Sequence, residues 1–388
     1  MKNRSKVSAV IEAAVVFALV FVTSFYDVFY SFDSLLRDKL YQTPRGINNK
    51  IKIIAIDDEA LREYGPFGTW SRGVYADIIN TLGEYPAAVA MDIMVFGDMD
   101  SQGDKALSEA CRNSGRVVAG SYISYTSAYK TDENGKPYID RFHIEQIEQP
   151  IAAADCITGF VNASPDDDGI VRSAFLTVSA PELYGDESFG SLAAETYYLY
   201  CKNTGTAANT PTLDDNGRMW ISYAGRPGDY EHISMSSLLD GSVDPRIFTD
   251  CIVLVGAYAS GLQDQFSVPN SSDQMFGVEI HANIIQGLLD GKCPVPANRV
   301  LSALAAAAAA VLAYLISKYS KVKISTPIII VMTAAYIAAG VMLNGSGLTI
   351  PILYAPLFMV ICYLVNLGRK YAEEAIEKRK ITAAFKKS

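Results

Sequence analysis

Apolar residues form four long stretches, one near the start of the chain and three near its end. The first, 7–26, is long enough to cross a bilayer, because about 20 apolar residues span the hydrocarbon core. Its apolar core is longer than that of a cleaved signal peptide, and no small-x-small cleavage site follows, so we interpret it as an uncleaved anchor. The others lie at 299–317, 324–343 and 348–367. The pattern predicts four transmembrane helices around the region 27–298.

Inside the region 27–298, short apolar runs alternate with amphipathic segments. The runs 51–56, 87–96 and 251–258 are typical of buried strands, and helical spacing marks the segments between them. This alternation predicts an α/β domain with a mostly parallel mixed sheet and flanking helices. The more polar segment 122–149 is predicted to be a surface insertion with a hairpin near Asn134-Gly135.

Two helical patterns continue beyond the apolar stretches. Apolar residues recur at helical spacing from Phe29 to Leu40, which predicts that the first helix continues to about Tyr41. The tail 368–388 is predicted to be a cytoplasmic connector helix. An imperfect heptad seam that includes Tyr371, Ile381 and Phe385 marks it as a dimer or signal helix. A solvated helix beside anionic lipid is the alternative.

Basic residues indicate the topology. They lie in the N-terminal segment 1–6, in the loop 318–323 and in the tail 368–388, whereas the loop 344–347 carries none. In a four-span arrangement these three basic flanks fall on one side of the membrane. The positive-inside rule then predicts that both termini are cytoplasmic and that 27–298 lies outside.

The charge is divided in the same way. The chain carries a net charge of −9, but the region 27–298 has 19 Lys and Arg against 38 Asp and Glu, a net −19, which leaves +10 for the remainder. A domain this acidic lacks the basic face of a nucleic-acid binder, so no nucleic-acid partner is expected. Its surface suits cations or cationic ligands, or is simply well solvated.

The sequence predicts no catalytic residue, metal site or cofactor in this chain. It has only three histidines, and His281 lies in a helical pattern as a packed or surface residue. The nucleophile-elbow, metalloprotease and zinc-ligand motifs are absent. The cysteines follow no disulfide or zinc spacing and are predicted to be buried free thiols. A single disulfide is the alternative, although the spacing indicates no pairing. The cysteines are Cys111, Cys156, Cys201, Cys251, Cys293 and Cys362.

Three aspartates follow predicted strands and suggest a ligand cleft. Asp57, Asp92 and Asp264 each lie at or beyond the carboxyl end of a strand. Ligands of parallel α/β sheets bind at that edge, so we predict one acidic cleft there, with Arg72 as a further candidate. The alternatives are that the aspartates cap the next helices and that Arg72 forms a structural pair with an aspartate.

The segment 163–176, ASPDDDGIVRSAFL, contains three adjacent carboxylates. With Gly169 at the sixth position of a calcium-binding loop, the twelfth would be Phe175 where the bidentate Glu is required, so such a loop is disfavoured. We predict a structural turn in which Asp166 and Asp168 bond nearby amides, Gly169 supplies a positive φ and Arg172 clamps an aspartate.

Glu12 lies inside the first apolar stretch. A carboxylate within a membrane span is a candidate for intramembrane signalling, because its burial in lipid is costly. Its place near the cytoplasmic end also allows it to reach the interface.

Five blocks in order carry a resemblance to a known family. They are IAIDDEALREYGPFGTWSR, VAMDIMVF, FVNASPDDDGIVRSAFL, VLVGAYASGLQDQFSVP and FGVEIHANIIQGLL, followed by three apolar stretches. Together they resemble the CHASE type-2 family of bacterial extracellular sensor domains. One departure is PFGTW, where the family often has a Trp-Pro segment before the arginine.

The resemblance implies a receptor of the bacterial cell membrane, with residues 27–298 extracellular or periplasmic. Such sensors precede a class III adenylate cyclase or a kinase, and the tail is most similar to the helix that leads into a cyclase. Class III cyclases act as homodimers, so the expected partners are a second copy, the lipid bilayer and an unknown extracellular ligand. The chain itself is not expected to be an enzyme; the full-length protein would be a cyclase if such a domain follows Ser388. The alternative is a structural or assembly protein whose outer domain binds a wall polymer or a partner protein.

Overall fold

The computed structural model describes residues 2–42, 45–98, 100–131 and 135–385. The chain divides into two compact units. The helical unit comprises Met1–Gln42 and Pro294–Ser388, and the α/β unit comprises Thr43–Cys293. Each is described by itself.

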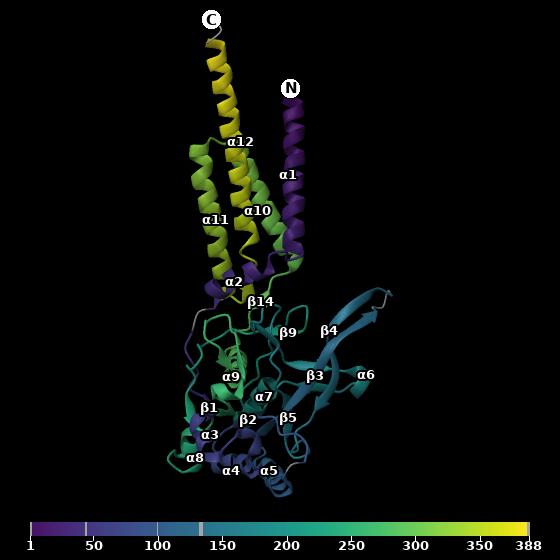
Figure 1. The fold of residues 1–388 in the computed structure, drawn as a ribbon, viewed down its shortest axis with the longest axis vertical. Coiled ribbons are helices and arrows are strands. Elements are labelled where there is room, and N and C mark those ends of the chain that lie inside the picture. The colour runs from purple at the N-terminus through teal and green to yellow at the C-terminus, as the bar shows by residue number, and fades with distance from the viewer. Residues whose placement is uncertain (1, 43–44, 99, 132–134, 386–388) are drawn as a thin grey trace. The chain divides into compact units, whose positions relative to one another are not determined.

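A largely parallel seven-stranded sheet forms the centre of the α/β unit, as the sequence pattern predicts (Figure 1). Its order is β10-β1-β11-β2-β3-β4, and β5 also pairs with β3. All pairs are parallel except β3 with β4. The strands are β1 Ile51–Ile56, β2 Ala88–Asp92, β3 Val117–Thr131, β4 Pro137–Glu148, β5 Ile157–Phe160, β10 His232–Ser234 and β11 Ile252–Ala257.

Both faces of the sheet are buried, which explains why the central strands read as continuous apolar runs. In β1, Ile53 packs into the core beneath one face and Ile54 into the core beneath the other, because successive side chains of a strand point to opposite faces. Helices α7 Leu192–Thr204 and α9 Gly277–Asp290 pack in the first core. Helices α3 Asp58–Tyr64, α4 Gly73–Leu82, α5 Ser101–Ser114 and α8 Met235–Leu239 pack in the second.

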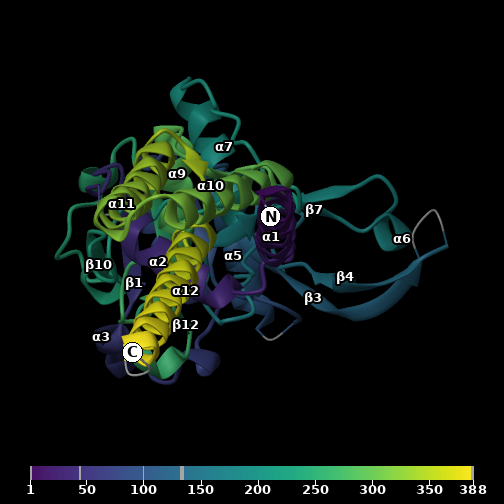
Figure 2. The same cartoon turned by 90° about the horizontal axis from the view of Figure 1, so that it is seen from above.

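The insertion is a hairpin, as predicted. Strands β3 and β4 pair antiparallel from Tyr122 with Glu148 to Thr131 with Pro137, with two irregularities in register. Residues 132–134, with part of the predicted turn, lie outside the described residues, and Gly135 has a φ of 78°. The hairpin extends away from the rest of the α/β unit in both ribbon views (Figure 1, Figure 2).

Short strands complete the α/β unit outside the main sheet. Strand β6, Ser173–Phe175, pairs with β9, Arg218–Trp220, and β7, Thr177–Ser179, pairs with β8, Ser188–Gly190. Strand β12, Gln265–Phe266, pairs with β13, Met275–Phe276. The segments before and after the 166–169 turn therefore belong to different sheets, since β5 lies in the main sheet.

In its described residues, the helical unit contains five helices and one short strand pair. The helices are α1 Lys2–Phe25, α2 Tyr30–Tyr41, α10 Arg299–Tyr319, α11 Val322–Gly345 and α12 Tyr354–Phe385; β14 Val295–Pro296 pairs with β15 Leu348–Thr349. Helix α10 lies against both α1 and α12 (Figure 2). Its buried face is a row of alanines that includes Ala303, Ala306 and Ala310. Such small residues let neighbouring membrane helices approach closely.

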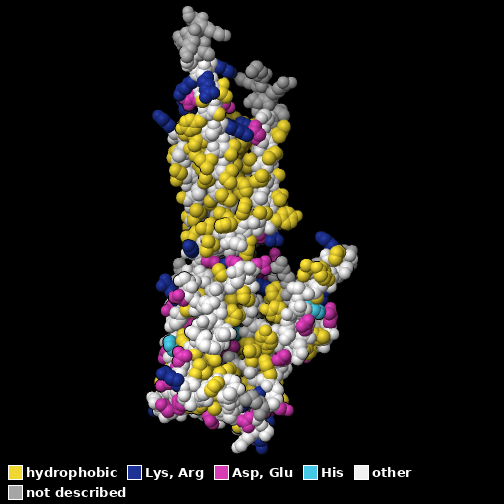
Figure 3. All heavy atoms as spheres, in the orientation of Figure 1, with side chains coloured by type: hydrophobic (Ala, Val, Ile, Leu, Met, Phe, Trp, Pro, Cys, Tyr) yellow, Lys and Arg dark blue, Asp and Glu magenta, His cyan; other side chains and the backbone are white. Residues whose placement is uncertain are grey.

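Three described helices are long and apolar enough to cross a membrane: Ser8–Phe25, Arg299–Tyr319 and Val322–Gly345. Their exposed apolar side chains dominate this face of the helical unit (Figure 3). The predicted fourth span, 348–367, is not one helix, because its first residues form β15 and a loop and α12 begins only at Tyr354. The start of this apolar stretch therefore pairs as a strand with β14 instead of joining the helix.

The prediction of one helix from the first span to about Tyr41 is wrong. Helix α1 ends at Phe25, and α2 begins at Tyr30. Between them Asp27 has a left-handed φ of 49°, which interrupts the helical hydrogen bonds. The Asp27 carboxylate accepts a bond of 2.6 Å from Arg299, so a tertiary contact stabilises the break.

All six cysteines are free, as predicted. Cys111, Cys201, Cys251 and Cys362 are buried, whereas Cys156 and Cys293 are partly buried.

Candidate functional site

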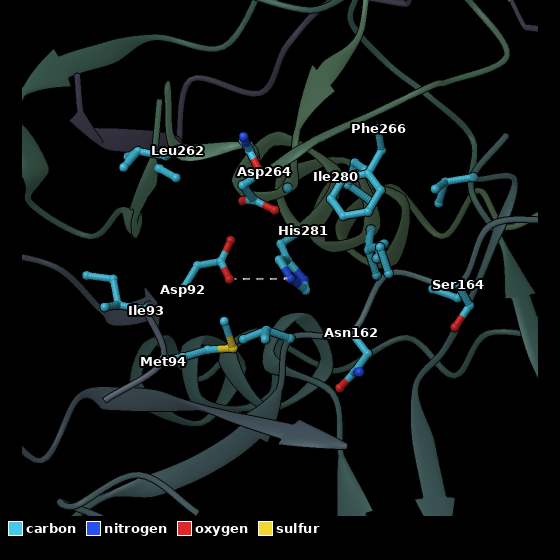
Figure 4. A pocket seen from close by; sticks show the side chains of 18 of the residues that line it. Asp92, Ile93, Met94, Asn162, Ser164, Leu262, Asp264, Phe266, Ile280 and His281 are labelled. Atoms are coloured by element: carbon cyan, nitrogen blue, oxygen red, sulfur yellow. Dashed lines mark ion pairs between the residues drawn. The ribbon is translucent and has the colours of Figure 1, made fainter. Parts of the chain in front are cut away.

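Two of the predicted aspartates meet at the carboxyl edge of the sheet. Asp92 is the last residue of β2, and Asp264 follows β11 after a short 3-10 turn, Ser260–Leu262. Since β2 and β11 are parallel neighbours, their ends open to the same side. Both aspartates line one cavity of about 310 Å³ at this edge (Figure 4).

Helix α9 brings a third titratable group, His281, into the same cavity. The helix can lie this close to the sheet because Gly256 has no side chain: a Cβ there would lie 2.9 Å from the Cβ of Val278 and 3.2 Å from that of Asp92. The first residue of α9, Gly277, leaves room for Asp264, since a Cβ would lie 2.6 Å from Oδ2 of that carboxylate. Two glycines thus permit the packing that forms the cavity.

Asp92 and His281 face each other without a hydrogen bond. The distance from Asp92 Oδ1 to His281 Nε2 is 3.9 Å, and their side chains are only 9% and 8% exposed. Among the described residues, Asp92 Oδ2 and His281 Nδ1 are buried without any hydrogen-bond partner. Buried polar atoms are nearly always paired in folded proteins, so these two unpaired atoms are a notable feature of the cavity.

Burial determines the charges of these three groups. It raises the pKa of Asp92 to about 7 and lowers the pKa of His281 to about 4. The pKa of Asp264 is raised to about 6, mainly by burial and further by the charge of Asp92. His281 is therefore neutral at pH 7, and in the acid range where His281 becomes charged the Asp92 carboxyl is already protonated. The contact between them (dashed in Figure 4) is thus a close approach of two buried polar groups, in which the two are not charged together.

The remaining walls of the cavity are mostly apolar. Phe67, Met94, Phe266 and Ile280 contribute hydrophobic surface, and Asn162 and several small residues contribute polar atoms. An apolar cavity with a few convergent polar groups is the usual form of a small-molecule site. Among the described residues, no three His, Cys, Asp or Glu side chains are grouped as a metal ion requires.

Asp57 lies at the same sheet edge but is not among the residues that line the cavity. Its carboxylate caps helix α3 by accepting a bond of 3.0 Å from the Ala60 amide, and it accepts another of 3.1 Å from the Ser234 hydroxyl. These are the contacts of the capping alternative.

Arg72 is also outside the cavity lining. It is buried and donates to Asp104 at 2.7 Å and to the carbonyl oxygens of Phe96 and Gly97. Because these bonds connect the start of α4 to the loop after β2, Arg72 has the geometry of a structural pair. The adjacent loop still contributes to the site through Phe67.

The 166–169 segment is a turn held by Arg172. The amide of Gly169 donates to the Asp166 carbonyl at 2.8 Å, and Gly169 has a φ of 82°. The buried guanidinium of Arg172 donates to Asp166 at 2.9 Å and to both carboxylate oxygens of Asp168 at 2.9 and 2.8 Å. These contacts match a structural turn rather than an ion-binding loop.

A separate polar cluster lies within the helical unit around Glu12. Its carboxylate accepts bonds from Tyr314 at 2.6 Å, Lys318 at 3.2 Å and Arg369 at 2.6 Å, and from the Ser8 hydroxyl at 2.7 Å. The donors come from α10 and α12 as well as from α1 itself. One carboxylate therefore joins three helices.

Sequence reasoning missed the role of His281 in the cavity wall. Its helical pattern shows that it lies on a helix, but not which face of α9 turns towards the strand ends. The nearest signal in the sequence is its place in the second turn of a helix that follows a strand-end aspartate, Asp264.

The comparisons with known proteins identify one family. The family described as CHASE2 domain matches residues 13–317, which is more than half of the chain and includes the whole α/β unit. No curated protein and no solved structure matches the chain.

Proposed function

The chain belongs to the CHASE2 domain family, an extracellular sensor domain family, and from this membership we propose that it is the sensing and membrane portion of a bacterial signalling receptor. The observation that carries the proposal is the extent of the match, which covers the α/β unit together with apolar helices on both sides of it in sequence. The α/β unit would detect a stimulus outside the cell through its cavity. The helices would transmit the change to a cytoplasmic output domain, which we propose to be an adenylate cyclase that makes cAMP.

For the topology, we propose four spans with both termini in the cytoplasm. The apolar first part of α12 is the proposed fourth span: it packs on α10 and α11, and apolar residues such as Ile361 and Val365 are exposed on its surface. With four spans, the basic residues near 1–6, 318–323 and 369–380 lie on one side of the membrane, as the positive-inside rule requires.

For the route of the signal, we propose the cluster around Glu12. In the chain, α1 leads through α2 to the α/β unit, α10 follows that unit, and α12 leads to the C-terminus. Glu12 bonds to Lys318 of α10 and to Arg369 of α12, so a shift between α1 and α10 changes the contacts of α12. A contiguous network of packed and hydrogen-bonded side chains is one physical route by which distant sites are coupled.

For the assembly, we propose a homodimer in which the α12 tails pair. Helix α12 extends to Phe385, and Tyr371 and Ile381 are 62% and 56% exposed, so their apolar side chains lack a cover within one chain. Their spacing fits a heptad seam. The side chain of Phe385 lies outside the described residues.

The dimer is tested by cross-linking. We expect Tyr371→Cys in a background in which the six native cysteines are changed to serine to give mostly covalent dimer under mild oxidation in membranes. The matched control is Arg379→Cys, two positions before the seam residue Ile381 on the same exposed tail. Only monomer from Tyr371→Cys, or equal cross-linking of both variants, would contradict pairing through this seam.

The receptor function is tested by joining a class III cyclase catalytic domain after Ser388 and measuring cAMP in cells that lack their own cyclase. We expect Asp92→Asn to change cAMP output by about fivefold or more, since typical allosteric coupling is 1–3 kcal/mol. In a Glu12→Gln background, Asp92→Asn should change cAMP output less: its effect, expressed as a free energy, should be less than about half of its effect in the native background. The control is Asp58→Asn, an exposed carboxylate at the same sheet edge.

If output is indifferent to Asp92 while the protein is inserted at the normal level, the receptor proposal fails. That outcome, together with a coding sequence that ends after Ser388, would favour a structural or assembly role. A coding sequence that continues into a cyclase or kinase domain supports the receptor.

A further inference from the structure

The charges in the cavity of the α/β unit all have one sign. Among the described residues that line it, Asp92 and Asp264 are acidic, His281 is the only other titratable side chain, and none is Lys or Arg. His281 is neutral at pH 7, because burial lowers its pKa to about 4. A charged group that enters the cavity at neutral pH is therefore stabilised if it is positive and repelled if it is negative.

The unpaired atoms of the cavity also require a donor. The side chain of Asp92 is only 9% exposed, and its buried Oδ2 atom has no hydrogen-bond partner among the described residues. Asp92, Asp264 and His281 point towards the same space from a strand end, a loop and a helix (Figure 4). A buried carboxylate oxygen without a partner is costly, and a charged N–H donor offers the strongest compensation.

We propose that this cavity binds a small organic monocation, a primary amine with an apolar body, whose ammonium group lies between Asp92 and Asp264. The inference rests on the proposed function, in which the cavity receives the stimulus. The apolar body would lie against Phe67, Met94, Phe266 and Ile280.

Other ligand classes fit the cavity less well. A metal ion lacks the required grouping of His, Cys, Asp or Glu side chains within the described residues. An amino acid would bring a carboxylate, and no lining residue in the described chain is a cation that could pair with it. The volume of about 310 Å³ is near the lower limit for ligand pockets, which selects a small molecule.

Proton linkage gives a pH dependence that a neutral ligand does not share. A bound ammonium group favours the ionised form of Asp92 and Asp264, whose pKa values without ligand are about 7 and about 6. Protons must therefore leave when the amine binds below pH 7, and the affinity falls as the pH falls. Among the described residues that line the cavity, His281 from α9 is the remaining titratable group facing these carboxylates, and it charges only near pH 4.

The test is calorimetric titration of the full chain in lipid nanodiscs, with empty nanodiscs as the blank. The probes are isoamylamine and phenethylamine, their neutral counterparts isoamyl alcohol and 2-phenylethanol, and the zwitterions leucine and phenylalanine. We expect at least one amine to bind at pH 8 at least about tenfold more tightly than its alcohol and its amino acid. The affinity should fall at least about tenfold at pH 5.

Two variants locate the site. Asp92→Asn keeps the shape of the side chain but removes its charge, and we expect it to weaken amine binding at pH 8 by about tenfold or more. Asp58→Asn is the matched control, because this carboxylate is exposed and lies at the same sheet edge outside the cavity, so binding should not change. Thermal unfolding of each variant verifies that it is folded.

Each outcome decides one point. If neither amine binds more tightly than its alcohol, or if Asp92→Asn binds like the native chain, the monocation site is overturned. If the amines fail while cAMP output still depends on Asp92, the ligand class is wrong and the receptor stands. If the amines bind while cAMP output is indifferent to Asp92, the site stands and the receptor proposal fails.

Discussion

Replacing Arg172 with alanine is expected to destabilise the α/β unit by about 3–5 kcal/mol, the usual cost of removing one partner from a buried ion pair. Its guanidinium is 3% exposed and bonds to both Asp166 and Asp168, whose side chains are 14% and 22% exposed. Without the arginine, two partly buried carboxylates remain close together and lose their main counter-charge. Because both can turn towards water, we expect the lower end of this range.

The measurement is denaturant unfolding of the full chain in detergent, followed by tryptophan fluorescence. The chain has two tryptophans, Trp70 and Trp220, and both lie in the α/β unit, so the signal reports this unit alone. Trp220 pairs with Ser173 in the β6–β9 ladder, directly beside Arg172.

Arg246→Ala is the matched control for Arg172. Arg246 also bonds to an aspartate, Asp244, but both side chains are exposed, at 73% and 46%. Exposed pairs contribute little, so the unfolding midpoint of this variant should equal that of the native chain. If Arg172→Ala shifts the midpoint no more than Arg246→Ala does, the turn does not depend on its arginine.

Replacing Asp92 with asparagine is expected to stabilise the α/β unit at pH 8, by about 2–4 kcal/mol. The pKa of this carboxyl is raised from 3.8 to about 7, so its ionisation opposes folding. A carboxyl with a raised pKa favours the folded state in acid, and that contribution is lost as the pH rises from about 4 through about 7. Asparagine never ionises and avoids this loss.

The difference between the Asp92→Asn variant and the native chain should therefore shrink as the pH falls, and most of it should vanish by pH 4. Thermal unfolding of the full chain at pH 4, 6 and 8, in the absence of amines, measures it. Asp264→Asn should show a smaller effect in the same direction, because the pKa of Asp264 is about 6. A stabilisation that is the same at all three pH values would show that Asp92 does not titrate in this range.

Part of the candidate site was predictable, because it follows from strand direction: two of the four residues predicted for the cleft line the cavity. Asp92 and Asp264 follow parallel strands, and the carboxyl ends of parallel strands share one edge. Asp57 satisfies the same rule, yet its carboxylate bonds to Ala60 and Ser234 instead. A strand-end position alone does not distinguish a helix cap from a cavity wall, because that depends on how the next segment leaves the strand.

The helical unit also has features that the sequence predicts and features that it does not. Its apolar stretches predict four spans, and three of the described helices are long and apolar enough to cross a membrane. The break at Asp27 and the late start of α12 at Tyr354 were not predictable, because each accompanies a partner distant in sequence: Arg299 for Asp27, and β14 for the residues before α12.

The sequence by itself thus determined the α/β class, the apolar helices long enough to cross a membrane and the family, because each depends on local periodicity, composition or residue order. Only the tertiary structure decided that His281 completes the cavity with Asp92 and Asp264, and that Arg72 and Asp57 do not line it. The physical reason is that a cavity is formed by the packing of α9 across the strand ends, and this close approach depends on Gly256 and Gly277, which are far apart from Asp92 in the chain.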